Sequence, residues 1–138
     1  MRKIKWGVLG TAYIFERDTA LGMQLADNCE LTAIAGRNPE KAAASKEKYG
    51  FQKAYGSYEE LLADPEIEAV YIPLPNTLHY EWTIKALQQG KHVLCEKPLA
   101  PSAKEAEEMF RAAKENRVYL MEAFAYQHSP FVKAVKKE

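Results

Sequence analysis

The chain has 138 residues, 47% hydrophobic and 28% charged, which is enough for one well-buried globular domain. Its 19 basic and 19 acidic residues leave a formal charge of zero, which argues against binding to nucleic acid or an anionic membrane. The two cysteines and three histidines are too scattered for a disulfide framework or a metal site, and no apolar run reaches the roughly 18 residues of a membrane span. We therefore expect a cytoplasmic protein whose partners are small molecules or other protein chains.

The N-terminal half alternates short apolar runs with longer amphipathic ones, the order expected of strands followed by helices. The predicted strands are Ile4–Leu9, Leu31–Ala35 and Lys53–Tyr55, and the first predicted helix runs from about Tyr13 to Ala26. Asn38 is placed to cap a second helix that has Pro39 in its first turn, and Gly50 is placed to end it. Each predicted strand is therefore followed by a turn or helix signal.

The C-terminal half continues the same alternation, with two Ser-x-x-Glu capping boxes at Ser57 and Ser102. The predicted helices are Tyr58–Ala63, one capped by Asn76 or Thr77 and ending near Gln89, one from Ser102 to Asn116, and Pro130–Lys137; the predicted strands are Ala69–Ile72, His92–Cys95 and Tyr119–Glu122. Strands joined by helical crossovers pair in parallel, and right-handed crossovers place helices on both faces of the sheet. The sequence therefore predicts a doubly wound, mainly parallel α/β fold.

Ligands of doubly wound sheets bind outside the carboxyl ends of the strands, so the loops there are the candidate sites. The first such loop contains Gly10, Thr11, Ala12, Tyr13 and Ile14, which we interpret as a phosphate-binding turn at a helix N-terminus. Compared with G-x-G-x-x-G, the second glycine is replaced by Ala12 and the third by Phe15. An ordinary tight turn between strand and helix is the alternative for this loop alone.

The second loop contains Gly36, Arg37 and Asn38, about 20 residues beyond the glycine turn, where NAD-binding domains usually carry an acidic residue for the ribose. Arginine at this place suits the 2′-phosphate of NADP or stacks on the adenine. We therefore favour NADP over NAD. A solvated arginine beside a helix cap is the alternative.

Two further segments carry a resemblance to a known family. The stretch Val70-Tyr71-Ile72-Pro73-Leu74-Pro75-Asn76-Thr77-Leu78-His79 and the strand end Cys95-Glu96-Lys97-Pro98 resemble the Gfo/Idh/MocA oxidoreductases. Leu120-Met121-Glu122-Ala123-Phe124 resembles the point where that family passes into its second domain. The resemblance covers nearly the whole chain, and the subgroup most similar to it contains sugar and dihydrodiol dehydrogenases.

The resemblance implies a catalytic role for Lys97, which would hydrogen-bond the reacting hydroxyl and stabilise a developing alkoxide. The proline after it restricts Lys97 to extended geometry and also permits a cis bond. Cofactor contacts are implied for Leu74, Pro75, Asn76, His79, Glu96 and Lys97. For Asn76, a helix cap is the alternative; for His79, a place in the first helical turn; and for Glu96, a structural carboxylate.

The resemblance also implies a domain division, with residues 1–122 as the dinucleotide-binding domain and 123–138 as the start of a truncated substrate domain. We expect NADP(H) or NAD(H) to exchange a hydride with a sugar, cyclitol or diol in the full-length enzyme, while this chain alone is inactive. A dinucleotide-sensing module without catalysis, or a scaffold that binds no dinucleotide, is the alternative. Apolar side chains at Phe124, Tyr126, Phe131 and Val132 predict a homo-oligomer.

Overall fold

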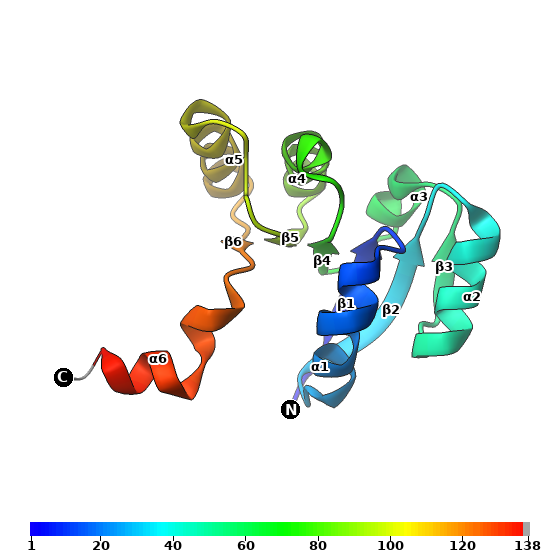
Figure 1. The fold of residues 1–138 in the computed structure, drawn as a ribbon. Coiled ribbons are helices and arrows are strands. Elements are labelled where there is room, and N and C mark those ends of the chain that lie inside the picture. Colours follow the sequence, from blue (N-terminus) through cyan, green and yellow to red (C-terminus); the bar gives the residue numbers. More distant parts are fainter. Residues whose placement is uncertain (137–138) are drawn as a thin grey trace.

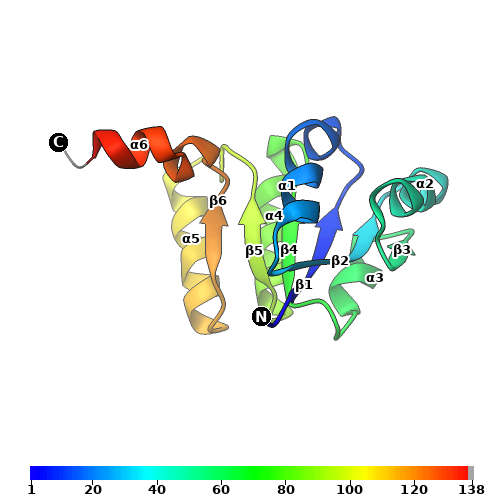
Figure 2. The same cartoon turned by 90° about the horizontal axis from the view of Figure 1, so that it is seen from below.

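Six parallel strands form one sheet in the order β3-β2-β1-β4-β5-β6 (Figure 2). A computed structural model describes residues 1–136 of the chain. The strands are β1 (Ile4–Leu9), β2 (Cys29–Ala35), β3 (Lys53–Tyr55), β4 (Ala69–Ile72), β5 (His92–Cys95) and β6 (Leu120–Glu122). The predicted doubly wound α/β fold is confirmed. The second strand begins at Cys29 rather than Leu31, because Cys29 and Glu30 already pair with β1.

Helices cover both faces of the sheet (Figure 1). The α-helices are α1 (Ala20–Leu25), α2 (Pro39–Tyr49), α3 (Tyr58–Ala63), α4 (His79–Gln88), α5 (Ala103–Glu115) and α6 (Pro130–Val135). Helices α3, α4 and α5 pack on one face, here the α3–α5 face, and α1 and α2 pack on the other, here the α1–α2 face. Helix α6 follows β6 and extends away from the sheet (Figure 2). No helix within residues 1–136 is long and apolar enough to cross a bilayer.

The two faces bury separate hydrophobic cores. The core of the α3–α5 face is the larger and includes Leu61, Leu87 and Met109, all with no exposed surface. The core of the α1–α2 face is centred on Phe15 and Tyr71, and the Phe15 ring lies 5.2 Å from that of Tyr49. Burial of such apolar area is the main favourable contribution to folding, so the larger core contributes more of it.

Most predicted helix ends are confirmed by their capping bonds. Asn38, Ser57 and Ser102 each accept a hydrogen bond from the backbone N–H three residues later, and Gly50 ends α2 in the left-handed region with φ +78°. The predicted cap by Asn76 or Thr77 is wrong. Asn76–Leu78 form a 3-10 turn, η2, and α4 begins after it at His79 without a side-chain cap.

The first predicted helix is confirmed, but its first part is π-helical. Helical backbone begins at Tyr13, and residues Phe15–Thr19 form the π-helical turn η1 before α1. The Ala20 N–H donates to Phe15 O, an i→i+5 hydrogen bond that spans one residue more than the i→i+4 bond of an α-helix. The predicted last helix is observed as Pro130–Val135, and Lys137 lies outside the described residues.

Candidate functional site

A crevice opens at the carboxyl edge of the sheet where the strand order reverses. Strand β1 lies between β2 and β4, so the loops that follow β1 and β4 turn to opposite faces. All the predicted site residues follow the carboxyl ends of strands β1, β2, β4 and β5. Parallel pairing therefore places them along one edge, although they are up to 87 positions apart, from Gly10 to Lys97.

The glycine loop lies against the loops of two neighbouring strands. Gly10 has φ +116°, and its N–H donates to Ala35 O at 2.8 Å. A Cβ atom on Gly10 would lie 3.0 Å from Leu74 Cδ2, and one on Gly36 would lie 3.2 Å from Thr11 Cγ2. The positive φ and the close approach explain glycine at position 10, and at position 36 a Cβ atom would press on Thr11. The structure thus brings Gly10, Thr11, Gly36 and Leu74 together.

The helix after Gly10 presents a set of backbone donors suited to a pyrophosphate. Ala12 O accepts the first helical bonds, from Phe15 N at 3.0 Å and Glu16 N at 3.4 Å. The N–H groups of Ala12, Tyr13 and Ile14 precede that first bond, so they have no partner within the helix. Such groups at a helix N-terminus bind phosphate, so this loop fits a dinucleotide.

Phe15 occupies the third glycine position of the fingerprint for a structural reason. Its side chain is fully buried and packs against Tyr49, Phe51 and Tyr71. In the fingerprint, the third glycine allows close packing of the helix on the sheet. Here the aromatic ring fills the space between helix and sheet, so the loop departs from the motif while its phosphate-facing part is unaffected.

Arg37 and Asn38 are both exposed after β2. Asn38 Oδ1 accepts from Lys41 N at 3.1 Å, so its side chain caps α2. Burial raises the pKa of the Tyr58 phenol, and the nearby Arg37 guanidinium offsets part of that rise. The exposed guanidinium is therefore accessible to an anion at this edge.

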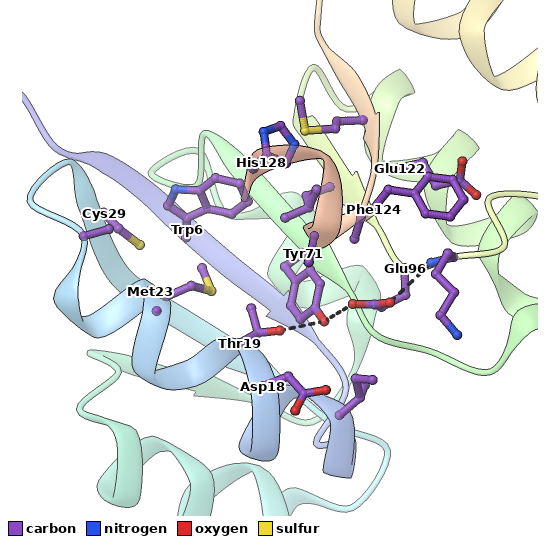
Figure 3. A pocket seen from close by; sticks show the side chains of 18 of the residues that line it. Trp6, Asp18, Thr19, Met23, Cys29, Tyr71, Glu96, Glu122, Phe124 and His128 are labelled. Atoms are coloured by element: carbon purple, nitrogen blue, oxygen red, sulfur yellow. Dashed lines mark hydrogen bonds between the residues drawn. The ribbon is translucent and has the colours of Figure 1, made fainter. Parts of the chain in front are cut away.

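A groove of about 850 Å³ runs along the α1–α2 face, between the first helix and the segment after β6 (Figure 3). Three predicted site residues line it, namely Ile14, Glu96 and Lys97. Its apolar part is formed by Trp6, Met23, Cys29, Leu94, Met121 and Phe124. The first helix borders the groove on one side, and the segment after β6, including the 3-10 turn Ala125–His128, borders it on the other.

Two groups hold the Glu96 carboxylate in the groove, and a third orients one of them. Tyr71 Oη donates to Glu96 Oε1 at 2.7 Å and accepts from Thr19 Oγ1 at 3.0 Å (Figure 3). The backbone N–H of Lys97 lies 3.3 Å from Glu96 Oε2. Burial and the adjacent Glu96 raise the pKa of Tyr71, so the phenol stays protonated and donates to the carboxylate. Tyr71 therefore fixes the orientation of Glu96.

Lys97 lies at the rim of the groove with its side chain exposed. The Lys97–Pro98 peptide bond is cis, one of the two geometries that the sequence permits. The next residue, Leu99, is anchored by its N–H, which donates to Glu122 Oε1 at 2.7 Å. Glu122 thus joins β6 to the loop that carries Lys97.

The loop after β4 separates the other predicted contacts. Pro75 and Asn76 are exposed at the edge, whereas Leu74 and His79 are buried. Both ring nitrogens of His79 lie 2.7 Å from backbone carbonyl oxygens, those of Pro98 and Leu74. His79 therefore holds protein loops together, and any influence it has on a cofactor passes through them.

Within residues 1–136, no group of three His, Cys, Asp or Glu side chains is placed to hold a metal ion.

Two residues of the site, Thr19 and Tyr71, were not predicted from the sequence. The alternation of β4 places Tyr71 on the face opposite Val70 and Ile72, which the sequence could have shown. Its bond to Glu96 spans 25 positions between two strands, and no local pattern indicates it.

Comparisons with known proteins agree with this geometry. Residues 4–124 match the family described as "Oxidoreductase family, NAD-binding Rossmann fold" (GFO_IDH_MocA). The chain is 46% identical over 125 residues to D-xylose 1-dehydrogenase (NADP(+)) 2 of Haloferax volcanii, covering 91% of this chain and 38% of that protein. It is 40% identical to scyllo-inositol 2-dehydrogenase (NADP(+)) IolU of Bacillus subtilis, covering 97% of this chain and 40% of the relative.

Solved structures extend the likeness to three dimensions. KijD10, a 3-ketoreductase from Actinomadura kijaniata in complex with NADP and TDP-benzene, superimposes with a TM-score of 0.94 at 38% identity. The match covers 99% of this chain and 42% of that one, so the chain spans less than half the length of these relatives. The chain therefore belongs to the Gfo/Idh/MocA family of oxidoreductases, and its residues 4–124 correspond to that family's NAD-binding Rossmann fold.

Proposed function

We propose that residues 1–122 bind NADP(H), with NAD(H) as the weaker ligand, and serve hydride transfer to or from a sugar, cyclitol or diol in a longer protein. The observation that carries this proposal is the shared edge of the sheet. It combines the open N–H groups of Ala12–Ile14 with Glu96 and Lys97 at one groove. A dinucleotide with its pyrophosphate on the helix N-terminus has room to extend toward that groove.

Within this proposal the residues have separate roles. A bound nicotinamide supplies or accepts the hydride. Lys97 Nζ donates a hydrogen bond to the substrate oxygen and stabilises negative charge there. Glu96, oriented by Tyr71, accepts hydrogen bonds from ribose hydroxyls. Gly10, Thr11, Tyr13 and Ile14 would hold the pyrophosphate of a bound dinucleotide, and Leu74, Pro75 and Asn76 would line the opposite side of the crevice.

The preference for NADP rests on Arg37 and on what the relatives are. Arg37 is exposed after β2, where the 2′-phosphate of a dinucleotide would lie, beside Gly36. The xylose and inositol dehydrogenases named above are NADP(+) enzymes, and KijD10 was crystallised with NADP. The relatives also support a polyhydroxylated substrate, since two of them are named as dehydrogenases of xylose and inositol and the third as a 3-ketoreductase.

Titration of the chain with NADPH and NADH, followed by Trp6 and Trp82 fluorescence, tests the binding. We expect tighter binding of NADPH, and Arg37→Ala should weaken NADPH about tenfold to 100-fold, the worth of one charge-assisted contact, while NADH is unchanged. Arg111→Ala, at an exposed position of α5 on the other face of the sheet, is the matched control for loss of one arginine. Equal affinity of wild type and Arg37→Ala for NADPH would refute the role of Arg37.

Catalysis is tested on a longer protein that carries this chain. Hydride transfer from NADPH or to NADP should be followed with xylose and inositol as first substrates, and Lys97→Ala should lower turnover at least about 100-fold. The chain of 138 residues alone should bind without turnover. Dinucleotide binding with no turnover in the longer protein would instead favour a dinucleotide-sensing module.

The segment after β6 is proposed to begin the substrate domain, with 123–138 as its start. Tyr126 is 59% exposed and Phe131 76% exposed, so this segment presents apolar surface. We propose that it supports self-association of this chain. Light scattering should then show a dimer or larger species, and a monomer at high concentration would contradict this.

A further inference from the structure

His79 joins two loops that both lead to the cofactor edge. Its Nε2 lies 2.7 Å from Leu74 O, in the loop after β4, and its Nδ1 lies 2.7 Å from Pro98 O, directly after Lys97. The side chain has no exposed surface, so water does not compete for either nitrogen. His79 is thus a direct polar link between the two loops.

The chemistry of the two partners determines what the ring must carry. Both acceptors are peptide carbonyl oxygens, which accept hydrogen bonds and cannot donate them. Each 2.7 Å contact therefore requires an N–H on the ring. A neutral imidazole has one N–H and would place a lone pair against the second carbonyl oxygen, whereas the imidazolium has an N–H at both nitrogens.

A buried cation needs compensating polar groups, and these lie along the same segment. Two carbonyl dipoles point at the ring from opposite sides. The carboxylate of Glu122 accepts from Leu99 N at 2.7 Å, one residue beyond Pro98. The two carbonyl oxygens are the groups that hydrogen-bond the ring and stabilise its charge, while Glu122 bonds the neighbouring backbone. The segment from Lys97 to Leu99 is thus held from both sides, by His79 and by Glu122.

We propose that His79 is a buried imidazolium that ties the loop after β4 to the loop after β5 and thereby positions Lys97. The positioning part rests on the proposed function of Lys97, whereas the charge of the ring does not. His79 is a positioning residue because it contacts protein carbonyls rather than ligand. A neutral His79 would leave one carbonyl repelled, and the loop holding Pro98 would then shift.

The charge is tested by nitrogen-15 NMR of the 138-residue chain labelled at histidine, at neutral pH. His79 should show a one-bond coupling to hydrogen at both Nδ1 and Nε2, and its signals are assigned as those absent from His79→Gln. A spectrum with one protonated and one bare nitrogen at His79 would overturn the proposal. This measurement uses the unmodified protein and needs neither dinucleotide nor turnover.

The positioning is tested by comparing two histidine substitutions. His79→Gln retains one donor group and should weaken NADPH binding about tenfold and change the backbone amide signal of Lys97. His92→Gln is the control, because His92 Nδ1 also bonds a backbone group, Tyr119 N at 2.9 Å, but at the opposite edge of the sheet. An unmoved Lys97 signal in folded His79→Gln would overturn positioning.

The outcomes separate this inference from the proposed function. If the unmodified chain binds no NADPH while His79 carries two N–H groups, the proposed function fails and the imidazolium bridge stands. If NADPH binds and His79 is neutral, the proposed function stands and the imidazolium bridge fails. Equal weakening by His79→Gln and His92→Gln would show a general loss of stability and would contradict a bridge specific to the cofactor edge.

Discussion

The two faces of the sheet are built from similar side chains and differ in what covers them. On the α3–α5 face, helices extend across to β6, and Met109, Cys95 and the sheet residues around them are buried. On the α1–α2 face, helices stop at β3 and β1, and the groove remains over β5 and β6. One face therefore supplies most of the buried core, and the other supplies the space in which Glu96 and Lys97 lie.

This difference matters because the same strands serve both faces. Along β5, Val93 and Cys95 point into the α3–α5 core while Leu94 points into the groove. A well-packed core on one side holds the strand ends that position the site on the other. The chain also offers matched residues, one on each face, and these allow the comparison to be tested directly.

The largest contrast should come from the two methionines. Met109 has no exposed surface in the α3–α5 core, whereas Met121 is 50% exposed in the groove. Met109→Ala should lower the free energy of unfolding by about 2–5 kcal/mol, because it leaves a cavity. Met121→Ala should cost about 0.5 kcal/mol, as for a surface position. Urea denaturation measures both, and equal losses would contradict the distinction between the faces.

The two cysteines should differ in reactivity. Burial raises the pKa of Cys29, at the groove, to about 11 and that of Cys95, in the α3–α5 core, to about 12. The thiolate is the reactive form, so both react slowly at pH 8 and faster as the pH rises toward those values. Cys95 also requires opening of the core, so Cys29 should react at least about 100-fold faster.

Iodoacetamide labelling followed by mass spectrometry measures both rates in one sample. Cys29→Ser provides the control, since it should leave only the slow reaction. Fast labelling of Cys95 in the folded chain would mean that the α3–α5 core is as accessible as the groove, and would contradict the difference between the two faces.

A smaller contrast concerns two tyrosine–glutamate pairs. Tyr71 bonds Glu96 on the α1–α2 face at 2.7 Å, and Tyr80 bonds Glu108 between α4 and α5 at 2.6 Å. Tyr71→Phe should cost about 1–2 kcal/mol of stability, since it also leaves Thr19 without its partner, and should weaken NADPH binding a few-fold by releasing Glu96. Tyr80→Phe removes a more exposed bond, so stability should fall less and affinity should not change. Unchanged affinity in Tyr71→Phe would show that Glu96 needs no orienting group.

Local signals predicted most of the fold. Asn38, Ser57 and Ser102 cap the helices because each offers an oxygen to an N–H three residues later, a relation that is visible in the sequence. Loop positions at the strand ends could also be predicted, since parallel pairing brings Gly10, Gly36 and Glu96 to one edge. Both features depend on residues close in the sequence or on the order of the strands, and the sequence shows both.

Relations between distant groups could not be predicted. The bond from Tyr71 to Glu96 and the two carbonyl partners of His79 depend on how loops pack after folding. The π-helical turn at Phe15–Thr19 leaves no clear mark either, because its composition suits an ordinary helix. The capping pattern at Asn76 misleads, because Asn76 begins a 3-10 turn and two further residues of that turn separate it from α4.

The π-helical turn also determines which side chains of the first helix reach the sheet. Its i→i+5 bond encloses one residue more than the i→i+4 bond of an α-helix, and such turns are frequent at functional sites. Here the wide turn places both Phe15 and Ala20 against the sheet and leaves Thr19 within reach of Tyr71. Removing one residue between them would rotate Thr19 away from the groove. Any graft of this helix onto another Rossmann domain must therefore retain its length to keep Thr19 beside Tyr71.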